Sequence, residues 1–359
     1  MSVSSLINKN YADCLRCEEN FIERKEGVPL LKLDANENQM GTSTAALGAM
    51  IKTAAQVNFH AGKMAAELKE KLAKSLSVAE RNIVIDSGTD SLIQHLFDAF
   101  LTEGDEVAAA SLQSDTFIQL IKQHGAGFVE VLLSDSGEQN LEALSAVVTD
   151  KTKFIFVTNP CNPTGTPIKP AAIQNFISSL PDHVILIIDE TYLDYADPEK
   201  YISCTELINS EKLIVLHSFF GIYGLAGESI AYMVSSEDIC RFAGSAIMPH
   251  SVSKVAIAGA SAALEDTGFV RACREEVAKS RDYLRNELRS LRFRVCRSQA
   301  NYVYAVLPET INADGLKEFL ESKGIYLRYY QGALCITVGT GWQCEHVVNT
   351  IKEYLGLRK

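Results

Sequence analysis

The sequence predicts an α/β fold, with a large domain built on a mostly parallel β-sheet flanked by helices and a smaller α+β domain. Two observations carry this prediction. Between residues 82 and 234, short apolar segments alternate with stretches of helical periodicity, which is typical of parallel strands joined by helical crossovers. After residue 269 the order changes to one long, charged helix followed by closely spaced strands and helices. A chain of 359 residues is long enough to form a core in each domain.

The large domain is expected to hold seven strands and the helices between them. The strands are expected at residues 82–86, 106–110, 128–133, 153–158, 184–189, 212–216 and 230–234. Helices are expected at residues 91–101, 115–124, 141–148 and 171–180. A further helix is expected at residues 64–76, where Ala65, Leu68, Leu72 and Leu76 form one apolar stripe. In such sheets, ligands bind beyond the carboxyl ends of the strands.

The two ends of the chain are expected to pack together in the smaller domain. Residues 1–44 are interpreted as an N-terminal arm with a helix at 15–26 and a strand at 30–33. The C-terminal elements are expected at 269–291, 293–297, 302–307, 313–323, 326–329, 333–338 and 345–355. The predicted division is therefore an arm at 1–44, a large domain at 45–260 and a small domain at 261–359.

Composition and charge exclude several classes of function. The net charge of −11, without a local basic cluster, argues against binding to nucleic acid. The longest apolar runs are too short to span a bilayer, and the start of the chain lacks the features of a signal peptide, so the cytoplasm is expected. Nine cysteines in such a chain indicate free thiols. Cys14 and Cys17 form a lone CxxC motif, and no metal site is predicted because no second ligand pair accompanies it.

Polar motifs follow three of the predicted strands. The segment TNPCNPTG at 158–165 forms a rigid turn that presents the amide of Asn162. Asp189 ends an apolar strand, so its carboxylate is expected to be substantially buried and in need of a partner. The segment DSGTDS at 86–91 ends a strand and begins a helix, whose free N–H groups suit an anion. Thr89 or Asp90 could equally be a helix cap.

These motifs, together with YGLAG at 223–227, carry a resemblance to a known family. The chain resembles the histidinol-phosphate aminotransferase branch of the class I/II aminotransferases, which have the fold-type-I architecture and depend on pyridoxal phosphate. LDANENQMG at 33–41 looks like that branch's N-terminal motif, and ITVGT at 336–340 looks like its C-terminal motif. The resemblance covers residues 30 to 351. It implies a large cofactor-binding domain, a small domain built from both chain ends, and a homodimer with its sites at the interface.

The resemblance also implies roles for individual residues. An aspartate like Asp189 pairs with the pyridine nitrogen, and residues like Asn162 and Tyr192 bind the phenolic oxygen of the ring. The residues that match positions around the phosphate are Thr89, Asp90 and Ser218. The residues that match positions at the substrate are Asn36, Arg328 and Cys335.

The residues that perform the family's chemistry are replaced in this sequence. Gly221 stands where a lysine forms the imine with the cofactor, and Ser229 stands where an arginine binds the phosphate. Cys335 stands where an arginine binds the substrate carboxylate. On looser alignments, Ser114 falls where an aromatic ring stacks on the pyridine, and Phe59 falls where a tyrosine of the neighbouring subunit reaches the phosphate. A glycine can neither hold the aldehyde nor shuttle a proton.

Two other residues are alternatives for the missing chemistry. Lys254 lies in segment 250–254, which approaches the dimer interface in this fold, but nothing in the spacing places its amine at the aldehyde. His217 ends a strand near the expected site. Some relatives that act on sugars carry a histidine at the lysine position, but that position here is Gly221, so the parallel fails.

Three hypotheses of function follow. In the first, the protein is a pseudoenzyme that binds a small ligand in the residual pyridine pocket, or a protein partner. It holds no covalent cofactor, and it binds pyridoxal phosphate or pyridoxamine phosphate only weakly and non-covalently. A neutral or cationic ligand suits this pocket because three cations are lost while Asp90 and Asp189 remain. In the second, the cleft carries lysine-free chemistry, with candidate groups Asp189, Tyr192, His217, Cys335 and Arg328. In the third, the protein is a working aminotransferase of the histidinol-phosphate type.

Overall fold

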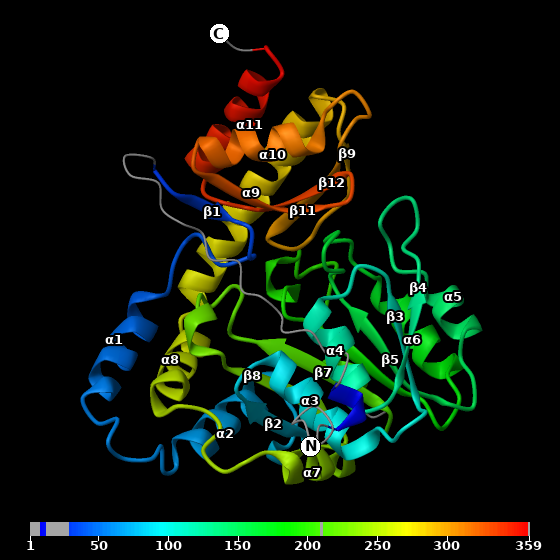
Figure 1. Ribbon diagram of the computed structural model, residues 1–359. Coiled ribbons are helices and arrows are strands. Elements are labelled where there is room, and N and C mark those ends of the chain that lie inside the picture. The colour runs from blue at the N-terminus through cyan, green and yellow to red at the C-terminus, as the bar shows by residue number, and fades with distance from the viewer. Residues whose placement is uncertain (1–7, 12–28, 209–210, 358–359) are drawn as a thin grey trace, which may run out of the picture.

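A seven-stranded sheet forms the centre of the protein (Figure 1). The structure is a computed structural model that describes residues 8–11, 29–208 and 211–357. The strand order is β2-β8-β7-β6-β5-β3-β4. The strands are β2 (Ile83–Asp86), β3 (Glu106–Ala110), β4 (Gly127–Val131), β5 (Thr152–Thr158), β6 (Ile185–Asp189), β7 (Leu213–Ser218) and β8 (Ala231–Ser235). Strand β8 is antiparallel to β2 and β7, whereas β3–β4, β3–β5, β5–β6 and β6–β7 are parallel pairs. The predicted mostly parallel sheet is confirmed.

Helices cover both faces of this sheet. Helices α3 (Thr89–Phe100), α4 (Asp115–Gln123) and α7 (Glu237–Ala246) pack on one face, where Phe97 meets Phe117 and Phe154. Helices α5 (Leu141–Ala146) and α6 (Pro170–Ser179) pack on the other, where Leu144 and Ile173 bury against the central strands. The apolar strand sequences therefore follow from burial on both faces.

A third group of helices packs against the β2–β8 edge of the sheet. It consists of α1 (Thr44–Ala54), α2 (Met64–Leu76) and α8 (Lys254–Glu265). Helix α2 has its predicted bounds, but α1, α7 and α8 were not predicted. Helix α8 is rich in small residues because it lies close to α1, and a Cβ atom at Gly259 would be 2.8 Å from Sδ of Met50. Such a helix lacks the apolar stripe on which periodicity depends.

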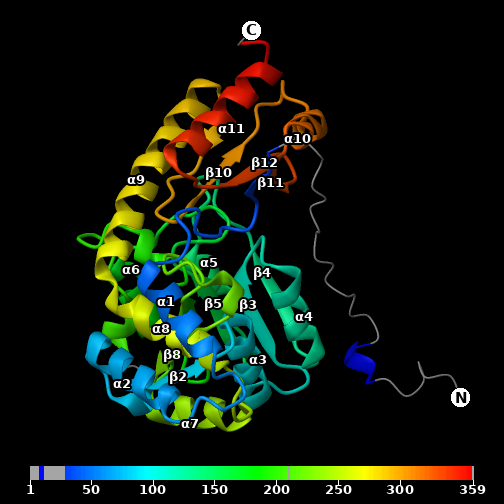
Figure 2. The ribbon, with the colours of Figure 1, turned by 90° about the vertical axis from the view of Figure 1, so that its left-hand side faces the viewer.

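The second sheet joins the two ends of the chain. Its order is β1-β11-β12-β10-β9, with β1 (Leu31–Leu33), β9 (Arg294–Val295), β10 (Tyr302–Val306), β11 (Ile325–Tyr330) and β12 (Ala333–Thr337). Strand β1 pairs in parallel with β11. Helices α9 (Thr267–Ser290), α10 (Ala313–Ser322) and α11 (Gly341–Tyr354) share one core with this sheet, and Figure 2 shows α9 and α11 side by side. The predicted domain boundaries at residues 44 and 260 stay a prediction.

The remaining elements are short. They are the 3₁₀ helices η2 (Lys9–Tyr11), η3 (Glu80–Asn82), η4 (Leu193–Tyr195), η5 (Cys204–Leu207) and η6 (Ala226–Glu228). The predicted helix at 15–26, Cys14 and Cys17 lie outside the described residues. Within the described ranges, no helix is long and apolar enough to cross a membrane, and no cluster of His, Cys, Asp or Glu residues could hold a metal ion. The seven cysteines of these ranges are free thiols.

Candidate functional site

The carboxyl ends of β2, β3, β5, β6 and β7 converge on one cavity of about 340 Å³. Strand β2 runs in the same direction as the four parallel strands because both β2 and β7 are antiparallel to β8. The lining residues that matter here are Thr89, Asp90, Ser114, Asn162, Asp189, Tyr192, Ser218, Phe220, Ser229, Arg328 and Tyr330. The cavity size lies within the range of small-molecule sites. Most of the predicted site residues therefore come together here, and Asn36 and Cys335 do not.

The carboxylate of Asp189 is fixed by its neighbour Thr191. Its Oδ1 accepts hydrogen bonds from the Thr191 N–H at 2.9 Å and from the Thr191 hydroxyl at 2.6 Å. Burial raises the pKa of Asp189, and the nearby Asp90 raises it further. No cation of the described residues forms an ion pair with Asp189. The second oxygen of this carboxylate is therefore available to a ligand that carries a donor or a positive charge.

The first turn of α3 offers free N–H groups to the cavity. Gly88 is the N-cap residue, with φ of 104° and no side chain to cap the helix. The next residues, Thr89 and Asp90, both line the cavity. Partial burial raises the pKa of Asp90, although the residue as a whole is exposed. This helix end therefore combines N–H donors, which suit an anion, with a carboxylate that opposes one.

Aromatic rings form another wall of the cavity. The Tyr192 ring lies edge-on to Tyr302 at a centroid distance of 5.0 Å and to Phe220 at 6.3 Å. Burial raises the pKa of Tyr192, so its hydroxyl is a neutral donor at physiological pH. Sequence reasoning missed Phe220. The signal was present, because Phe220 directly precedes Gly221, the position where the resemblance places the lysine.

Gly221 is buried just beyond β7, and atoms of Thr191 and Tyr195 lie close to it. A Cβ atom at this position would lie 3.1 Å from the carbonyl oxygen of Thr191 and 3.4 Å from Cε2 of Tyr195. Ser229, where the resemblance leads one to expect an arginine, is exposed, lines the cavity and has a φ of 43°. Neither residue brings a positive charge to the site.

Cys335 lies outside the cavity, in a cluster of aromatic residues. It is 1% exposed and packs with Ala300 and Tyr302, next to Tyr192, Tyr304 and Tyr330. Its Sγ is 3.7 Å from the carbonyl oxygen of Pro163, and burial raises the pKa of its thiol to about 12. The geometry therefore does not place this residue at a substrate, because its side chain is buried and does not line the cavity.

Asn36 is a structural link rather than a residue of the cavity wall. Its N–H donates to Oγ1 of Thr337 at 2.9 Å, and its carbonyl accepts a bond from Nδ2 of Asn301 at 2.8 Å. Its side chain also lies close enough to the Tyr192 hydroxyl to affect the pKa of that group. Asn36 thus links the N-terminal segment to β12, and its side chain interacts with the hydroxyl of Tyr192.

Three other residues named from the sequence lie elsewhere. His217 precedes Ser218 on β7, so its side chain points to the opposite face and lines a different cavity. Phe59 is 67% exposed and does not line the site. Lys254 donates from Nζ to the carbonyl oxygen of Gln56 at 3.0 Å and also lies outside the cavity wall.

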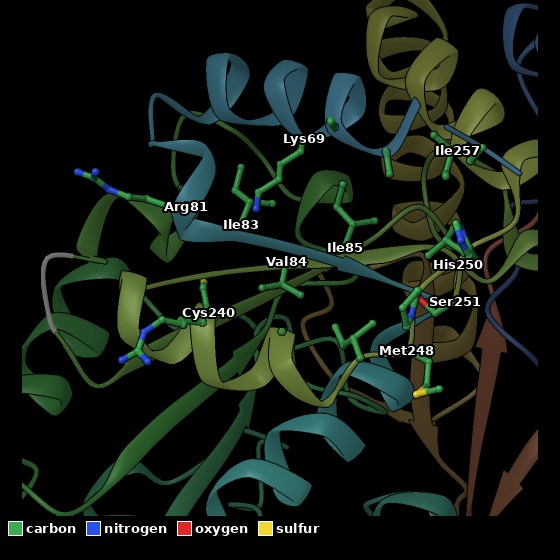
Figure 3. Close-up of a pocket in the computed structure, with 18 of the residues that line it drawn as sticks. Lys69, Arg81, Ile83, Val84, Ile85, Cys240, Met248, His250, Ser251 and Ile257 are labelled. Carbon is green, nitrogen blue, oxygen red and sulfur yellow. The ribbon is translucent and has the colours of Figure 1, made fainter. Parts of the chain in front are cut away.

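A larger cavity, of about 660 Å³, lies over the edge strand β2 between α2 and α7 (Figure 3). Ile83 and Ile85 lie on the side of β2 that faces α2, and Val84 lies on the other side. Lys69 lies near one end of this cavity and Met248 near the other. None of the strand-end motifs lines it, so the candidate site is the smaller cavity, where the polar groups converge.

Comparison with known proteins agrees with this architecture. A parallel sheet with its polar motifs at the carboxyl ends of strands, joined to a smaller unit built from both chain ends, defines an aminotransferase-like protein. The model of the family "Aminotransferase class I and II" matches residues 28–351. The chain belongs to this family, which depends on pyridoxal phosphate.

Relatives and solved structures cover most of the chain. A histidinol-phosphate aminotransferase of Moorella thermoacetica is 30% identical over 344 residues, covering 93% of this chain and 88% of that protein. An aromatic amino acid aminotransferase of Mycobacteroides abscessus is 33% identical over 279 residues, covering 78% of this chain and 80% of that protein. A putative histidinol-phosphate aminotransferase from Erwinia carotovora atroseptica has a similar structure, with a TM-score of 0.87, 22% identity, and coverage of 92% of this chain and 99% of that one.

One similar structure contains the cofactor. The histidinol-phosphate aminotransferase of Sinorhizobium meliloti was solved in complex with pyridoxal-5'-phosphate, and it superimposes with a TM-score of 0.84 at 24% identity, covering 91% of this chain and 90% of that one. In the present chain only the ring-binding half of such a site fits, since Asp189, Asn162 and Tyr192 face one cavity. Residue 221 is a glycine, and among the described residues Arg328 is the one cation that lines this cavity. The residues present do not fit a covalently held cofactor.

Proposed function

We propose that this protein is an aminotransferase-fold protein that binds a small ligand and does not perform ordinary transamination. One observation carries the proposal: no lysine lines the cavity among the described residues, and residue 221, where the family's lysine is expected, is a glycine. Transamination of this type needs a primary amine that holds the cofactor aldehyde and then moves a proton. The guanidinium of Arg328 cannot replace it, because it stays protonated.

The charges of the cavity indicate which ligands it accepts. Its charged lining residues in the described ranges are Asp90, Asp189 and Arg328. Two carboxylates and one guanidinium leave the site with a net negative charge when all are ionised. We therefore infer that it prefers a neutral or cationic ring, which would lie beside Tyr192 and Phe220 with a donor directed at Asp189. A ligand that carries a phosphate is expected to bind less well.

The test uses two ligands that differ only in the phosphate. Pyridoxamine and pyridoxamine phosphate are titrated by calorimetry against the wild-type protein and against Asp189→Asn. Pyridoxamine should bind at least as tightly as its phosphate ester, and Asp189→Asn should weaken its binding by roughly tenfold or more, since it removes one charged hydrogen bond. Tighter binding of the phosphate ester by tenfold or more would contradict the charge argument.

A second measurement tests the absence of an imine. The protein is incubated with pyridoxal phosphate, reduced with borohydride and analysed by mass spectrometry of its peptides. No lysine should carry the cofactor in stoichiometric amount. A stoichiometric adduct at one lysine, Lys254 included, together with transfer of an amino group from an amino acid, would support the activity of the relatives instead and overturn the proposal.

We also propose that the protein forms a homodimer. Apolar side chains are exposed along α1 and in the two loops near it. They are Leu47 at 48%, Ile51 at 65%, Val57 at 66%, Phe59 at 67% and Met248 at 72% exposure. Exposed apolar side chains of this number and size mark an interaction surface when they are contiguous. Light scattering after size exclusion should give twice the chain mass, and Ile51→Glu together with Phe59→Glu should give the mass of one chain. A wild-type monomer at micromolar concentration would exclude the dimer.

A further inference from the structure

A second polar cavity lies behind the sheet, away from the candidate site. Its volume is about 320 Å³. It is enclosed by η4 and the segment that leads to η5, by β7 and β8, and by parts of α2, α8 and α9. Its polar lining residues include Asp194, Tyr201, Ser203, Glu206, His217, Tyr223, Tyr232 and Arg274. None of these residues lines the cavity at the strand ends.

Opposite charges line this cavity without a salt bridge between them, although the charge of Arg274 partly offsets the rise in the pKa of Asp194 that burial causes. Arg274 donates from Nε to the carbonyl oxygen of Asp194 at 2.7 Å, and this bond holds the guanidinium in place. Its terminal nitrogens have no hydrogen bond or ion pair with any described residue. The carboxylate of Asp194 likewise has no partner in the described ranges, and the same holds for Glu206 at the more exposed edge. A partly buried charge needs a counter-group, so Asp194 and the terminal nitrogens of Arg274 can each bind an oppositely charged group of a ligand, whereas Glu206 is exposed to solvent.

His217 provides an independent sign of a ligand. It is 8% exposed, and its ring stacks on Tyr232 at a centroid distance of 5.0 Å. Its Nε2 lies 3.4 Å from Oε2 of Glu190 and 3.4 Å from Oγ of Ser203. Its Nδ1 has no partner among the described residues. Because His217 lines the cavity, a ring nitrogen without a protein partner can take a hydrogen bond from a ligand or a water molecule there.

The Glu190 carboxylate fixes this histidine and does not itself reach the cavity. Glu190 is fully buried and accepts hydrogen bonds from the Ser203 hydroxyl at 2.5 Å and from the Cys204 N–H at 2.8 Å. With Nε2 directed at Glu190 and Ser203, the other ring nitrogen of His217 is left as an acceptor. The cavity therefore offers an acceptor, two carboxylates and one guanidinium.

We propose that this cavity binds a small zwitterion, a free α-amino acid. Its carboxylate would pair with the terminal nitrogens of Arg274, and its ammonium group would bind between Asp194, Glu206 and Nδ1 of His217. A simple anion would face two carboxylates, and a simple cation would leave Arg274 unpaired. A purely apolar ligand would leave every one of these groups without a partner, which costs more than its burial gains. A zwitterion satisfies both signs of charge and replaces the water that such a cavity otherwise holds.

The site is independent of the function proposed above. It lies on the opposite face of β7 from Ser218. Helix α9, which contributes Arg274 to the cavity, also packs against the five-stranded sheet. A failure of either proposal therefore leaves the other untouched, because the two cavities share no lining residue.

The experiment screens the twenty common amino acids by thermal unfolding and measures any hit by calorimetry. For the best amino acid, two derivatives are compared with it: the methyl ester, which lacks the carboxylate, and the N-acetyl form, which lacks the ammonium group. At least one amino acid should bind saturably, and either derivative should bind roughly tenfold or more weakly. Arg274→Gln and Asp194→Asn should each cause a loss of similar size.

Matched controls separate this site from effects on folding and from the other cavity. Arg271→Gln alters an exposed arginine one turn earlier on α9 and should leave binding unchanged. Asp189→Asn alters the strand-end cavity and should also leave it unchanged. If Arg274→Gln does not fold, the binding of the amino acid to the isosteric variant Asp194→Asn still tests the proposal. The proposal fails if no amino acid binds at about 10 mM, if the ester binds as tightly as the amino acid, or if the Asp194 variant binds like wild type.

Discussion

A Cβ atom at Gly221 would lie 3.1 Å from the carbonyl oxygen of Thr191. This distance joins the two strand ends on which the candidate site is built, since Gly221 follows β7 and Thr191 follows β6. Thr191 in turn donates both of its hydrogen bonds to Asp189. A side chain at residue 221 must therefore displace the carbonyl of Thr191, the residue whose N–H and hydroxyl hold the carboxylate of Asp189 in place.

Gly221→Ala should destabilise the protein even though alanine is the smallest side chain. The added methyl group forces the Thr191 carbonyl to move by a few tenths of an ångström, and we expect a loss of about 1 kcal/mol in the free energy of unfolding. Gly227 is the matched control in the same segment, because a Cβ atom there meets nothing within 4 Å. Gly227→Ala should change the stability by less than about 0.5 kcal/mol. Urea denaturation measures both, and equal values for the two variants would show that residue 221 is not constrained.

Arginine introduced at Cys335 and at Ser229, the two positions where the resemblance places an arginine, should change the stability by very different amounts. Cys335→Arg would place a guanidinium among buried tyrosines, where the described residues offer no carboxylate partner. We expect a loss of about 3 kcal/mol or more. Ser229→Arg adds the same side chain at an exposed position and should cost less than about 0.5 kcal/mol. Thermal and urea unfolding compare the two, and a Cys335→Arg variant as stable as wild type would mean that its side chain reaches the open cavity.

The central sheet and most of its helices could be predicted because burial leaves a regular pattern in the sequence. Helix α2 has an apolar stripe with helical periodicity, and β5 and β6 each contain a continuous run of four apolar residues. Helix α8 could not be predicted in this way, because most of its own residues are small and carry no clear apolar periodicity. Its position depends on the close approach of Met50 to Gly259, which is a contact between distant parts of the chain.

The site residues that follow the ends of strands could be predicted from the sequence. The site residues whose side-chain direction depends on packing could not. Asp189 and Asn162 follow directly from strand ends and line the cavity. Cys335 lies on a strand next to the cavity, yet the surrounding tyrosines turn it into a core residue. The face to which His217 points depends on the register of β7, which becomes fixed only when Ser218 is known to face the cavity.

The Glu190 carboxylate should make the stability of this protein depend on pH in an unusual direction. Burial raises the pKa of Glu190 from its ordinary 4.5 to about 7. Between pH 4.5 and pH 7, Glu190 is therefore protonated in the folded state and ionised in the unfolded state. Its contribution to the stability falls as the pH rises through this range. Burial lowers the pKa of the neighbouring His217 to about 4, and its contribution instead falls as the pH drops below 6.5.

Glu190→Gln separates these two contributions. The difference in unfolding free energy between this variant and wild type should increase from pH 4.5 to pH 7 by about 3 kcal/mol, because each pKa unit corresponds to about 1.4 kcal/mol. The variant alone should lose stability as the pH falls from 6.5 to 4, since only the histidine remains. Urea denaturation at several pH values measures both. A difference that stays constant over this range would mean that Glu190 is ionised in the folded protein.

Asp189→Asn should make the protein more stable while it weakens the ligand site. The asparagine oxygen can accept both hydrogen bonds from Thr191, and the substitution removes a charge that no described cation neutralises. Because burial raises the pKa of Asp189, the cost of this charge is absent below the ordinary aspartate pKa of about 3.8 and grows as the pH rises through the folded value. We expect a gain of about 1 kcal/mol at pH 8 and none near pH 3.5. Urea denaturation at the two pH values tests this, and a loss of stability at pH 8 would reveal that Asp189 has a cationic partner in the folded protein.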